Sequence, residues 1–338
     1  MATVWVCILL LNMESFVKKL VPSIIAATFS FCFAACGQSE TSKTAATPTS
    51  AASPTVSGDQ IQLSSKAGNI TLPTNIDKIA VLDFTSLDTI NALGGADKVV
   101  GLPLSAAVPV SLNSFKDGKY TDFGAVNNIN VEKLAAAQPH LIVSADRLAK
   151  QDEAFKQIVP TYHYSIDLDN YWASFHEQTL NLAKVIGKTA EAEKKLTEID
   201  ALAAQVAEKT KGKTALIVMV NSEKLMAFGT NSRFGMIHDK LGFTPIDTSI
   251  KVGTHGQSIS YEFITEKNPD YLFVIDRASA VTGKNGGAEA ALNNDIIKQS
   301  KASKEGHIVY LNANNWYLMN CGLNVIIYIV NEVSAAVK

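Results

Sequence analysis

The sequence predicts an α/β protein made of two α/β lobes, one on each side of a long helical segment. Two observations support this prediction. From Ile61 onward, short apolar runs of strand length alternate with longer segments of helical period. In addition, a unit made of a helix, a proline, a strand and the pair Asp-Arg occurs twice, at 129–147 and at 259–277, an offset of 130 residues. We expect one copy in each lobe.

The predicted elements follow one another along the chain. A hairpin is expected at IQLSSKAGNITLP, followed by strands at KIAVLDF, KVVGLP, HLIVSA and TYHYSI. Two helical segments come next, NYWASFHEQTLNLAKVIG and KTAEAEKKLTEIDALAAQVAEKTKG, and the second ends on Gly212 as at a helix C-cap. Strands are then expected at TALIVMVN, KLMAFG, YLFVID and HIVYLN. Strands and helices on both sides of a long helix favour two layered α/β lobes.

The first 35 residues are typical of a secretory signal. Lys18 and Lys19 precede an apolar stretch that ends in small residues before Cys36. This stretch is shorter than the ~20 residues that a membrane-spanning helix needs. Its end, FAACG, resembles the lipobox of bacterial lipoproteins, in which the cysteine is acylated. Residues 36–60 are rich in Ser, Thr, Ala and Pro, which predicts a disordered tether.

Composition excludes several classes of site and partner. Once the signal is removed, Cys321 has no cysteine partner beyond the acylated Cys36, so a disulfide framework and a zinc site built on thiolates are excluded. The formal charge is −2, and removing Glu14, Lys18 and Lys19 makes it −3. A chain with this charge is not a general binder of nucleic acid or other polyanions. Any affinity for an anion must therefore be local.

Arginine is rare in this chain and is found only in connections that follow strands. Of the 30 basic residues, three are arginines, namely Arg147, Arg233 and Arg277. In open α/β sheets the carboxyl ends of strands are where ligands bind. The planar guanidinium group holds an anion in fixed geometry better than an ammonium group does. A structural bridge to a neighbouring carboxylate is an equally good explanation for any single arginine, but a weaker one for all three.

Each repeat arginine directly follows an aspartate, Asp146 or Asp276. We interpret these carboxylates as groups that hold the guanidinium groups in place. The alternative is that they only cap the ends of the strands.

Two further side chains are candidate ligands for iron. His255 lies in the glycine-flanked loop VGTHGQS, and Tyr317 lies in the polar loop NANNWYLMN after the last strand. Imidazole and phenolate both bind iron, although a single loop histidine is more often only solvated and a Trp-Tyr pair more often a packing element. The remaining histidines fall in expected helices or strands and are interpreted as structural: His140, His163, His176, His238 and His307.

The chain contains no P-loop, nucleophile elbow, HExxH helix or dinucleotide fingerprint, so it is not expected to be an enzyme.

Taken together, these features resemble the ferric-siderophore-binding lipoproteins of bacterial ABC importers. The resemblance runs from about residue 61 to about residue 323, and it rests on the lipobox, the tether, NSRFGMIHDKLGF, GTHGQSISYEFI and NWYL. It is strongest to the group that binds catecholate siderophores such as petrobactin and enterobactin fragments. The end of the chain departs from the family pattern, with Cys321 in place of a glycine and an apolar run VIIYIV in the last helix.

The resemblance implies a class III periplasmic-binding-protein fold, with two Rossmann-like lobes joined by one rigid helix and a ligand cleft between the lobes. On this basis we expect an N-terminal lobe at 61–187, an inter-lobe helix at 188–210 and a C-terminal lobe at 211–338. The family's arginine triad matches Arg147, Arg233 and Arg277. Where a siderophore supplies only four donor atoms, the resemblance implies that His255 and Tyr317 bind Fe³⁺ directly.

The resemblance also implies the partners and the location. The protein is expected to be exported and anchored to the cell membrane through lipid on Cys36, facing the periplasm or the cell exterior. It would act as a monomer with no permanent cofactor, delivering a ferric siderophore to a permease and its ATPase. The alternatives are a haem- or cobalamin-binding protein of the same fold, or a surface lipoprotein with no transport function.

Overall fold

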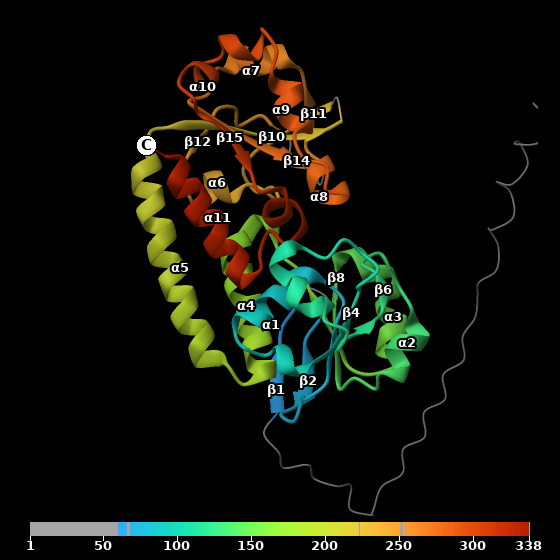
Figure 1. Ribbon diagram of the computed structural model, residues 1–338. Coiled ribbons are helices and arrows are strands. Elements are labelled where there is room, and N and C mark those ends of the chain that lie inside the picture. The colour runs from blue at the N-terminus through green and yellow to red at the C-terminus, as the bar shows by residue number, and fades with distance from the viewer. Residues whose placement is uncertain (1–59, 66–67, 223, 251–252, 254, 338) are drawn as a thin grey trace, which may run out of the picture. The chain divides into compact units, whose positions relative to one another are not determined.

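The first sheet is parallel and lies in the N-terminal half of the chain (Figure 1). The computed structural model describes residues 60–65, 68–222, 224–250, 253 and 255–337. These residues belong to one compact unit, Val56–Lys338. The expected signal, Cys36 and all of the expected tether except Gln60 lie outside the described residues.

This N-terminal sheet has the strand order β5-β4-β3-β8-β9, with every pair parallel. Its strands are β3 (Ile79–Val81), β4 (Val99–Leu102), β5 (Thr121–Asp122), β8 (Leu141–Ala145) and β9 (Thr161–Tyr164). Strands β3, β4 and β8 are nearly continuous apolar runs, as is usual in a parallel sheet that is covered on both faces. The helices of this half are α1 (Phe84–Ala92), α2 (Val131–Ala136), α3 (Asp152–Lys156) and α4 (Tyr171–Ile186). This half also contains two short antiparallel pairs. One is β1 (Gln60–Leu63) with β2 (Ile70–Pro73), and the other is β6 (Gly124–Ala125) with β7 (Asn128–Ile129).

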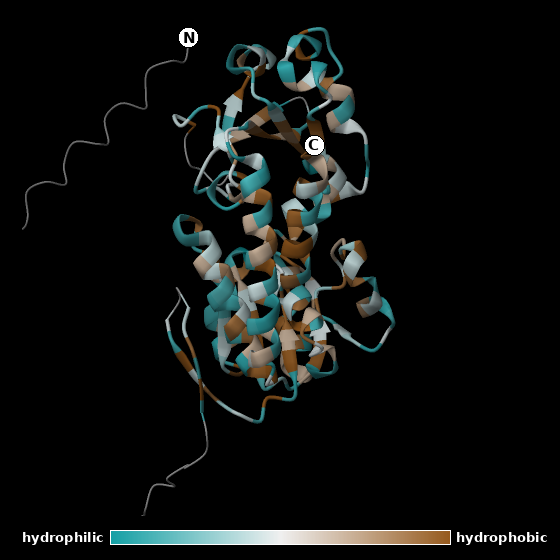
Figure 2. Ribbon diagram, turned by 90° about the vertical axis from the view of Figure 1, so that its left-hand side faces the viewer, coloured by the Kyte–Doolittle hydropathy of each residue, from teal (hydrophilic) through white to brown (hydrophobic). Residues whose placement is uncertain are grey.

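The second sheet is mixed and has the order β13-β11-β10-β14-β15, with β12 also paired to β10. Its strands are β10 (Thr214–Asn221), β11 (Lys224–Phe228), β12 (Thr244–Pro245), β13 (Gln257–Ile259), β14 (Tyr271–Asp276) and β15 (Ile308–Leu311). The helices are α6 (Met236–Asp239), α7 (Tyr261–Lys267), α8 (Arg277–Thr282), α9 (Gly287–Leu292) and α10 (Lys301–Lys304). In Figure 2 the hydrophobic colouring is concentrated in the strands and on the helix sides that face them.

One long helix, α5 (Thr189–Thr210), connects the two halves of the chain. The preceding α4 ends at Gly187, whose φ of 69° is the left-handed conformation that glycine adopts without strain. The buried residues of α5 form one stripe along the helix: Ala192, Leu196, Ile199, Ala203, Val206 and Thr210. Their spacing of three and four residues is that of a helix with one covered face. The expected α/β fold with two lobes and one connecting helix is confirmed.

The duplicated unit also appears in the structure. Helix α2 precedes β8 in the first lobe, and α7 precedes β14 in the second. Both helices are capped at matching positions: Asn130 Oδ1 accepts from Lys133 N, and Ser260 Oγ accepts from Phe263 N. The repeat therefore extends to the signals that start its helices.

The last helix, α11 (Leu323–Ala336), lies within the residues expected for the C-terminal lobe, 211–338, but packs against elements of the first half of the chain. It contacts α1 and α5, and Asp88 Oδ2 on α1 accepts from Asn324 N at 2.9 Å and Val325 N at 3.2 Å. The run VIIYIV buries its apolar face here, while Tyr328 is 57% exposed on the other side. The last helix therefore packs against the first lobe, because its apolar side chains are buried there.

No helix among the described residues has both the length and the apolar character needed to cross a membrane.

Short 3₁₀ segments lie at η1 (Ala96–Lys98), η2 (Val110–Lys116), η3 (Asp146–Gln151), η4 (Leu168–Asn170) and η5 (Ile297–Gln299), and a π-helical turn lies at η6 (Asn314–Leu318). Two of them, η3 and η6, carry expected site residues.

Candidate ligand-binding site

The three arginines lie in connections that follow strands. Arg147 is the second residue of η3, directly after β8. Arg277 begins α8, directly after β14. Arg233 lies in the turn between β11 and α6. Each arginine therefore follows the carboxyl end of a strand, where the sheet ends and a side chain can face a ligand.

Tyr317 contacts two of these arginines, although it is far from both in sequence. Its hydroxyl oxygen accepts a hydrogen bond from Arg277 Nε at 3.0 Å, and its backbone oxygen accepts from Arg233 Nη2 at 2.7 Å. Its ring centroid lies 4.6 Å from Arg233 Cζ and 5.7 Å from Arg277 Cζ. Aromatic rings attract cations at such distances through the negative potential of the ring face. The tyrosine thus holds two positive charges near one another.

Arg233 is half-buried. Burial lowers the pKa of its guanidinium, the contact with Tyr317 opposes that effect, and the positive charge of Arg147 adds to it. Arg147 is therefore near enough for its charge to be felt at Arg233. Asn320 Nδ2 donates to the backbone oxygen of Arg233 at 3.2 Å, which holds this turn against the segment that follows Tyr317. Positive charges gathered in this way favour an anion between them.

Arg277 has a second partner that sequence reasoning did not identify. Its Nη1 donates to Asn221 Oδ1 at 3.3 Å, and Asn221 is the last residue of β10, the strand paired with β14. A polar residue at the carboxyl end of a strand is the same signal that identified the arginines, so Asn221 could have been found by the same rule.

Arg147 differs from the other two arginines. Its side chain is exposed, and within the described part of the chain it makes no hydrogen bond or ion pair. It is therefore available for a ligand without first breaking a contact.

The two aspartates do not hold the guanidinium groups as expected. Asp276 caps α8 by accepting from Ser279 N at 3.0 Å, and it also accepts from Ala288 N at 3.0 Å. Asp146 Oδ1 lies 2.9 Å from His163 Nε2. For Asp276 the alternative of a capping role is the one that the structure supports. The physical reason is local: a carboxylate at the start of a helix is closer to free backbone N–H groups than to the next side chain.

His255 lies in an exposed turn and has no hydrogen bond or ring contact with other described residues. The structure therefore does not bring it together with Tyr317, and its role as an iron ligand stays a prediction. Within the same residues, no group of three or more His, Cys, Asp or Glu side chains is placed to hold a metal ion.

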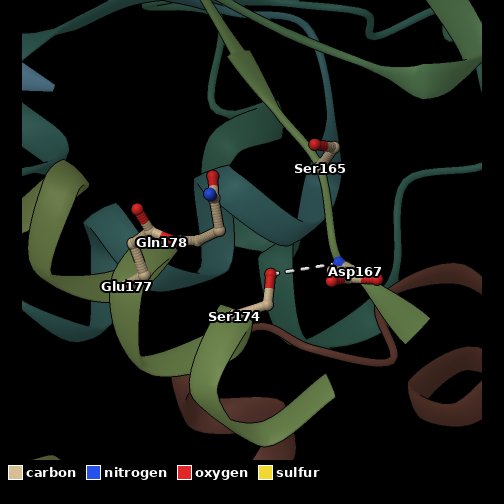
Figure 3. A pocket seen from close by; sticks show the side chains of 5 residues that line it. All are labelled: Ser165, Asp167, Ser174, Glu177 and Gln178. Atoms are coloured by element: carbon tan, nitrogen blue, oxygen red, sulfur yellow. Dashed lines mark hydrogen bonds between the residues drawn. The ribbon is translucent and has the colours of Figure 1, made fainter. Parts of the chain in front are cut away.

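Two polar pockets lie beside β9 and not at the arginines. The first, of about 300 Å³, is lined by Ser165, Asp167, Ser174, Glu177 and Gln178, and in it Asp167 N donates to Ser174 Oγ at 3.1 Å (Figure 3). It has no cationic lining, so it does not fit the expected anion. The second, of about 290 Å³, reaches Asp146 and His163.

Residues 79–314 match the family model described as periplasmic binding protein. The chain belongs to this family. Among its relatives is the petrobactin-binding protein YclQ of Bacillus subtilis, 40% identical over 265 residues, which cover 78% of this chain and 83% of the relative. The ferric-anguibactin-binding protein FatB of Vibrio anguillarum is 30% identical over 273 residues, which cover 79% of this chain and 84% of that protein.

Solved structures of periplasmic binding proteins have the same fold. The crystal structure of YclQ from Bacillus subtilis superposes with a TM-score of 0.79 and 37% identity, covering 83% of this chain and 99% of that one. The periplasmic catecholate-siderophore binding protein VctP of Vibrio cholerae gives a TM-score of 0.78 and 29% identity, covering 82% and 100%. The family resemblance inferred from the motifs is confirmed.

Proposed function

We propose that this chain is the substrate-binding protein of an ABC importer and that it captures a ferric catecholate siderophore. The observation that carries this proposal is the arrangement of Arg233 and Arg277 around Tyr317, with Arg147 exposed and without a partner among the described residues. The names of its relatives support it, because petrobactin, anguibactin and catecholate siderophores are what those proteins are said to bind.

The charge of such a ligand fits three arginines. A ferric tris-catecholate carries three negative charges, and three guanidinium groups can neutralise them. Each charge-assisted hydrogen bond contributes roughly 1.5–3 kcal/mol. The ligand would lie between Arg147 of the first lobe and Arg233 and Arg277 of the second. Haem carries two propionates and would use these three cations less fully.

With a siderophore that supplies four donor atoms, two positions on octahedral iron stay open. We propose that the Tyr317 phenolate and the His255 imidazole fill them, since both are iron ligands in proteins. The iron is cargo in this scheme, and the protein acts as a receptor and not as an enzyme.

The proposal extends to location and partners. The chain would be exported, anchored through lipid on Cys36, and would deliver its ligand as a monomer to a membrane permease driven by an ATPase. The family matched here supports the exported binding role.

Tryptophan fluorescence tests the proposal directly. Trp316 is buried beside Tyr317, so a ferric catecholate bound there should quench its emission. We expect quenching at micromolar ferric petrobactin or ferric enterobactin, with haem binding more weakly to the same sample. Absence of quenching or of any binding at micromolar concentration would refute the proposed function.

A matched pair of variants tests the role of Arg147. Arg147→Ala should weaken binding about tenfold or more, the loss expected when one charge-assisted hydrogen bond is removed. Lys150→Ala, which removes another exposed cation of η3, should change the dissociation constant less than twofold if geometry matters more than bulk charge. Equal effects of the two substitutions would contradict a specific role for Arg147.

A further inference from the structure

A histidine of the first lobe lies between two carboxylates, next to the segment that carries Arg147. His163, in β9, is 8% exposed. Its Nδ1 lies 2.5 Å from Asp152 Oδ2, and its Nε2 lies 2.9 Å from Asp146 Oδ1. Ser144 Oγ donates a further hydrogen bond to Asp152 Oδ1. The ring therefore has a carboxylate partner on both nitrogens.

The two carboxylates stand at the two ends of one short segment. Asp146 is the first residue of η3, and Asp152 follows directly after its last residue, Gln151. A single imidazole thus joins both ends of the six-residue segment on which Arg147 lies. Leu148 in the middle of this segment is 1% exposed and anchors it in the apolar core, and the two contacts with His163 restrain its ends, including the backbone from which Arg147 projects.

With both carboxylates ionised, both contacts exist together only when the imidazole is charged. A carboxylate accepts hydrogen bonds, and a neutral imidazole has only one N–H to donate, whereas the imidazolium has two. The surroundings favour the charged form: the hydrogen bond with Asp146 raises the pKa of His163 most, burial opposes this, and Asp152 raises it further.

The other titratable groups around the ring do not reverse the preference of His163 for its charged form. Glu153 and Lys156 of α3 line the 290 Å³ pocket that also contains His163, and their side chains form an ion pair at 2.8 Å. In the C-terminal segment, Cys321 is near enough to Asp146 for the charge of that carboxylate to raise the pKa of the thiol. Burial is the larger cause and brings this pKa to about 12, so the thiol is neutral. Lys150 and Arg147 are exposed on η3 itself.

We propose that His163 is a positioning residue for ligand binding: its imidazolium clamps Asp146 and Asp152, holds η3 in place and thereby sets the position of Arg147. This inference rests on the proposed function for the identity of the ligand. It gives Asp146 a role different from that of a direct partner of Arg147.

The clamp makes ligand affinity depend on pH in a defined direction. A raised pKa means that the stabilisation is fully present below the ordinary histidine value of 6.5 and is lost as the pH rises through the pKa in the folded protein. On deprotonation one carboxylate loses its donor. The Asp146 side chain is 74% exposed and that of Asp152 10%, so Asp146 is the one that water can solvate, and its end of η3 is released. The cluster also becomes more negative beside an anion site.

A comparison of three proteins tests this dependence. Wild type, His163→Gln and His140→Gln are titrated with ferric petrobactin between pH 6 and pH 9. Glutamine can donate and accept hydrogen bonds but carries no charge, and His140 is an exposed histidine of the same lobe. Ionisation of the ligand itself cancels in the ratio of two dissociation constants measured at one pH.

We expect the affinity advantage of wild type over His163→Gln to be about tenfold at pH 6, the value of one charge-assisted hydrogen bond, and to decrease as the pH rises toward 9. His140→Gln should follow wild type throughout. A ratio between wild type and His163→Gln that does not change with pH would overturn the proposal, since a purely structural role predicts a constant loss.

A second measurement needs no ligand. Arg147 and Lys150 are both trypsin sites on η3, so release of this segment should speed cleavage after them. We expect faster cleavage at pH 7 in His163→Gln and in Asp146→Ala, which removes the acceptor and, because the Asp146 side chain is 74% exposed, should leave the fold intact. His140→Gln should be cleaved as wild type is.

Unchanged cleavage in both His163→Gln and Asp146→Ala would refute the clamp. If wild type failed to bind ferric petrobactin, the proposed function would fail, and the proteolysis would still decide the role of His163.

Discussion

Replacing Tyr317 by phenylalanine separates the two ways in which this residue organises the site. The substitution removes the hydroxyl that accepts from Arg277 Nε at 3.0 Å. It keeps the ring that lies 4.6 Å from Arg233 Cζ and the backbone oxygen that accepts from Arg233 Nη2. The effect should therefore fall on Arg277 and leave Arg233 in place.

The size of the effect follows from the contacts that remain. A hydrogen bond to a charged group contributes about 1.5–3 kcal/mol. Arg277 keeps its longer bond to Asn221 Oδ1 at 3.3 Å, so we expect the lower part of that range, near 1.5 kcal/mol, or an increase of about tenfold in the dissociation constant. If Tyr317 also binds iron, the loss should be larger for a siderophore with two catechols than for one with three.

The assay is quenching of Trp316 fluorescence by ferric complexes of two-catechol and three-catechol ligands. Tyr328→Phe is the matched control, because that tyrosine is 57% exposed on α11 and has no role in the site. A dissociation constant for Tyr317→Phe within twofold of wild type for both ligands would refute the reasoning. An equal loss for both ligands would support the contact with Arg277 and argue against iron ligation.

Two further predictions concern the docking of α11 on α1. Gly322→Ala should destabilise the fold by about 1–3 kcal/mol through overpacking, because an added Cβ would lie 2.4 Å from Asp88 Oδ2. Urea unfolding measures the free energy of unfolding of this variant. Gly253→Ala is the control, because an added Cβ there has no described atom within 4 Å. A loss no greater than that of the control would contradict the close approach. Burial raises the pKa of Asp88 from 3.8 to about 6, so ionising it opposes folding, and its contribution to stability falls as the pH rises from about 4 to about 6. The difference of about 2 pKa units corresponds to roughly 3 kcal/mol, and Asp88→Asn should be more stable relative to wild type at pH 7 than at pH 4 by about that amount. Parallel unfolding free energies of the two proteins across this range would show the reasoning to be wrong.

Much of the fold could be predicted because its signals are local. The run TALIVMVN is β10 over the same residues, 214–221, and YLFVID is β14 over 271–276. The long helix α5 begins and ends within one residue of the predicted limits, 188 and 210. Apolar period, capping residues and glycine stops act over a few residues, so they can be read without knowing what a segment packs against. Short strands such as β12 and β13 lacked such a signal, since two or three residues have no period.

The candidate site could be predicted in its residues but only partly in its contacts. The position of Arg147, Arg233 and Arg277 after strands follows from the repeat and the strand pattern. That Tyr317 lies against two of them does not, because those partners are 84 and 40 residues away in the chain.

The sequence by itself determined the longer strands, the long helix, the duplication and the residues that carry charge to the ends of the sheets. Tertiary structure alone decided which of these residues meet. Asp146 and Arg147 are neighbours in the chain, yet Asp146 contacts His163, 17 residues away, and leaves Arg147 exposed. Helix α11 likewise packs on α1, with Asp88 bound to a backbone N–H 236 residues later. Side-chain direction and packing between distant segments set such contacts, and neither is encoded in the spacing of residues along the chain.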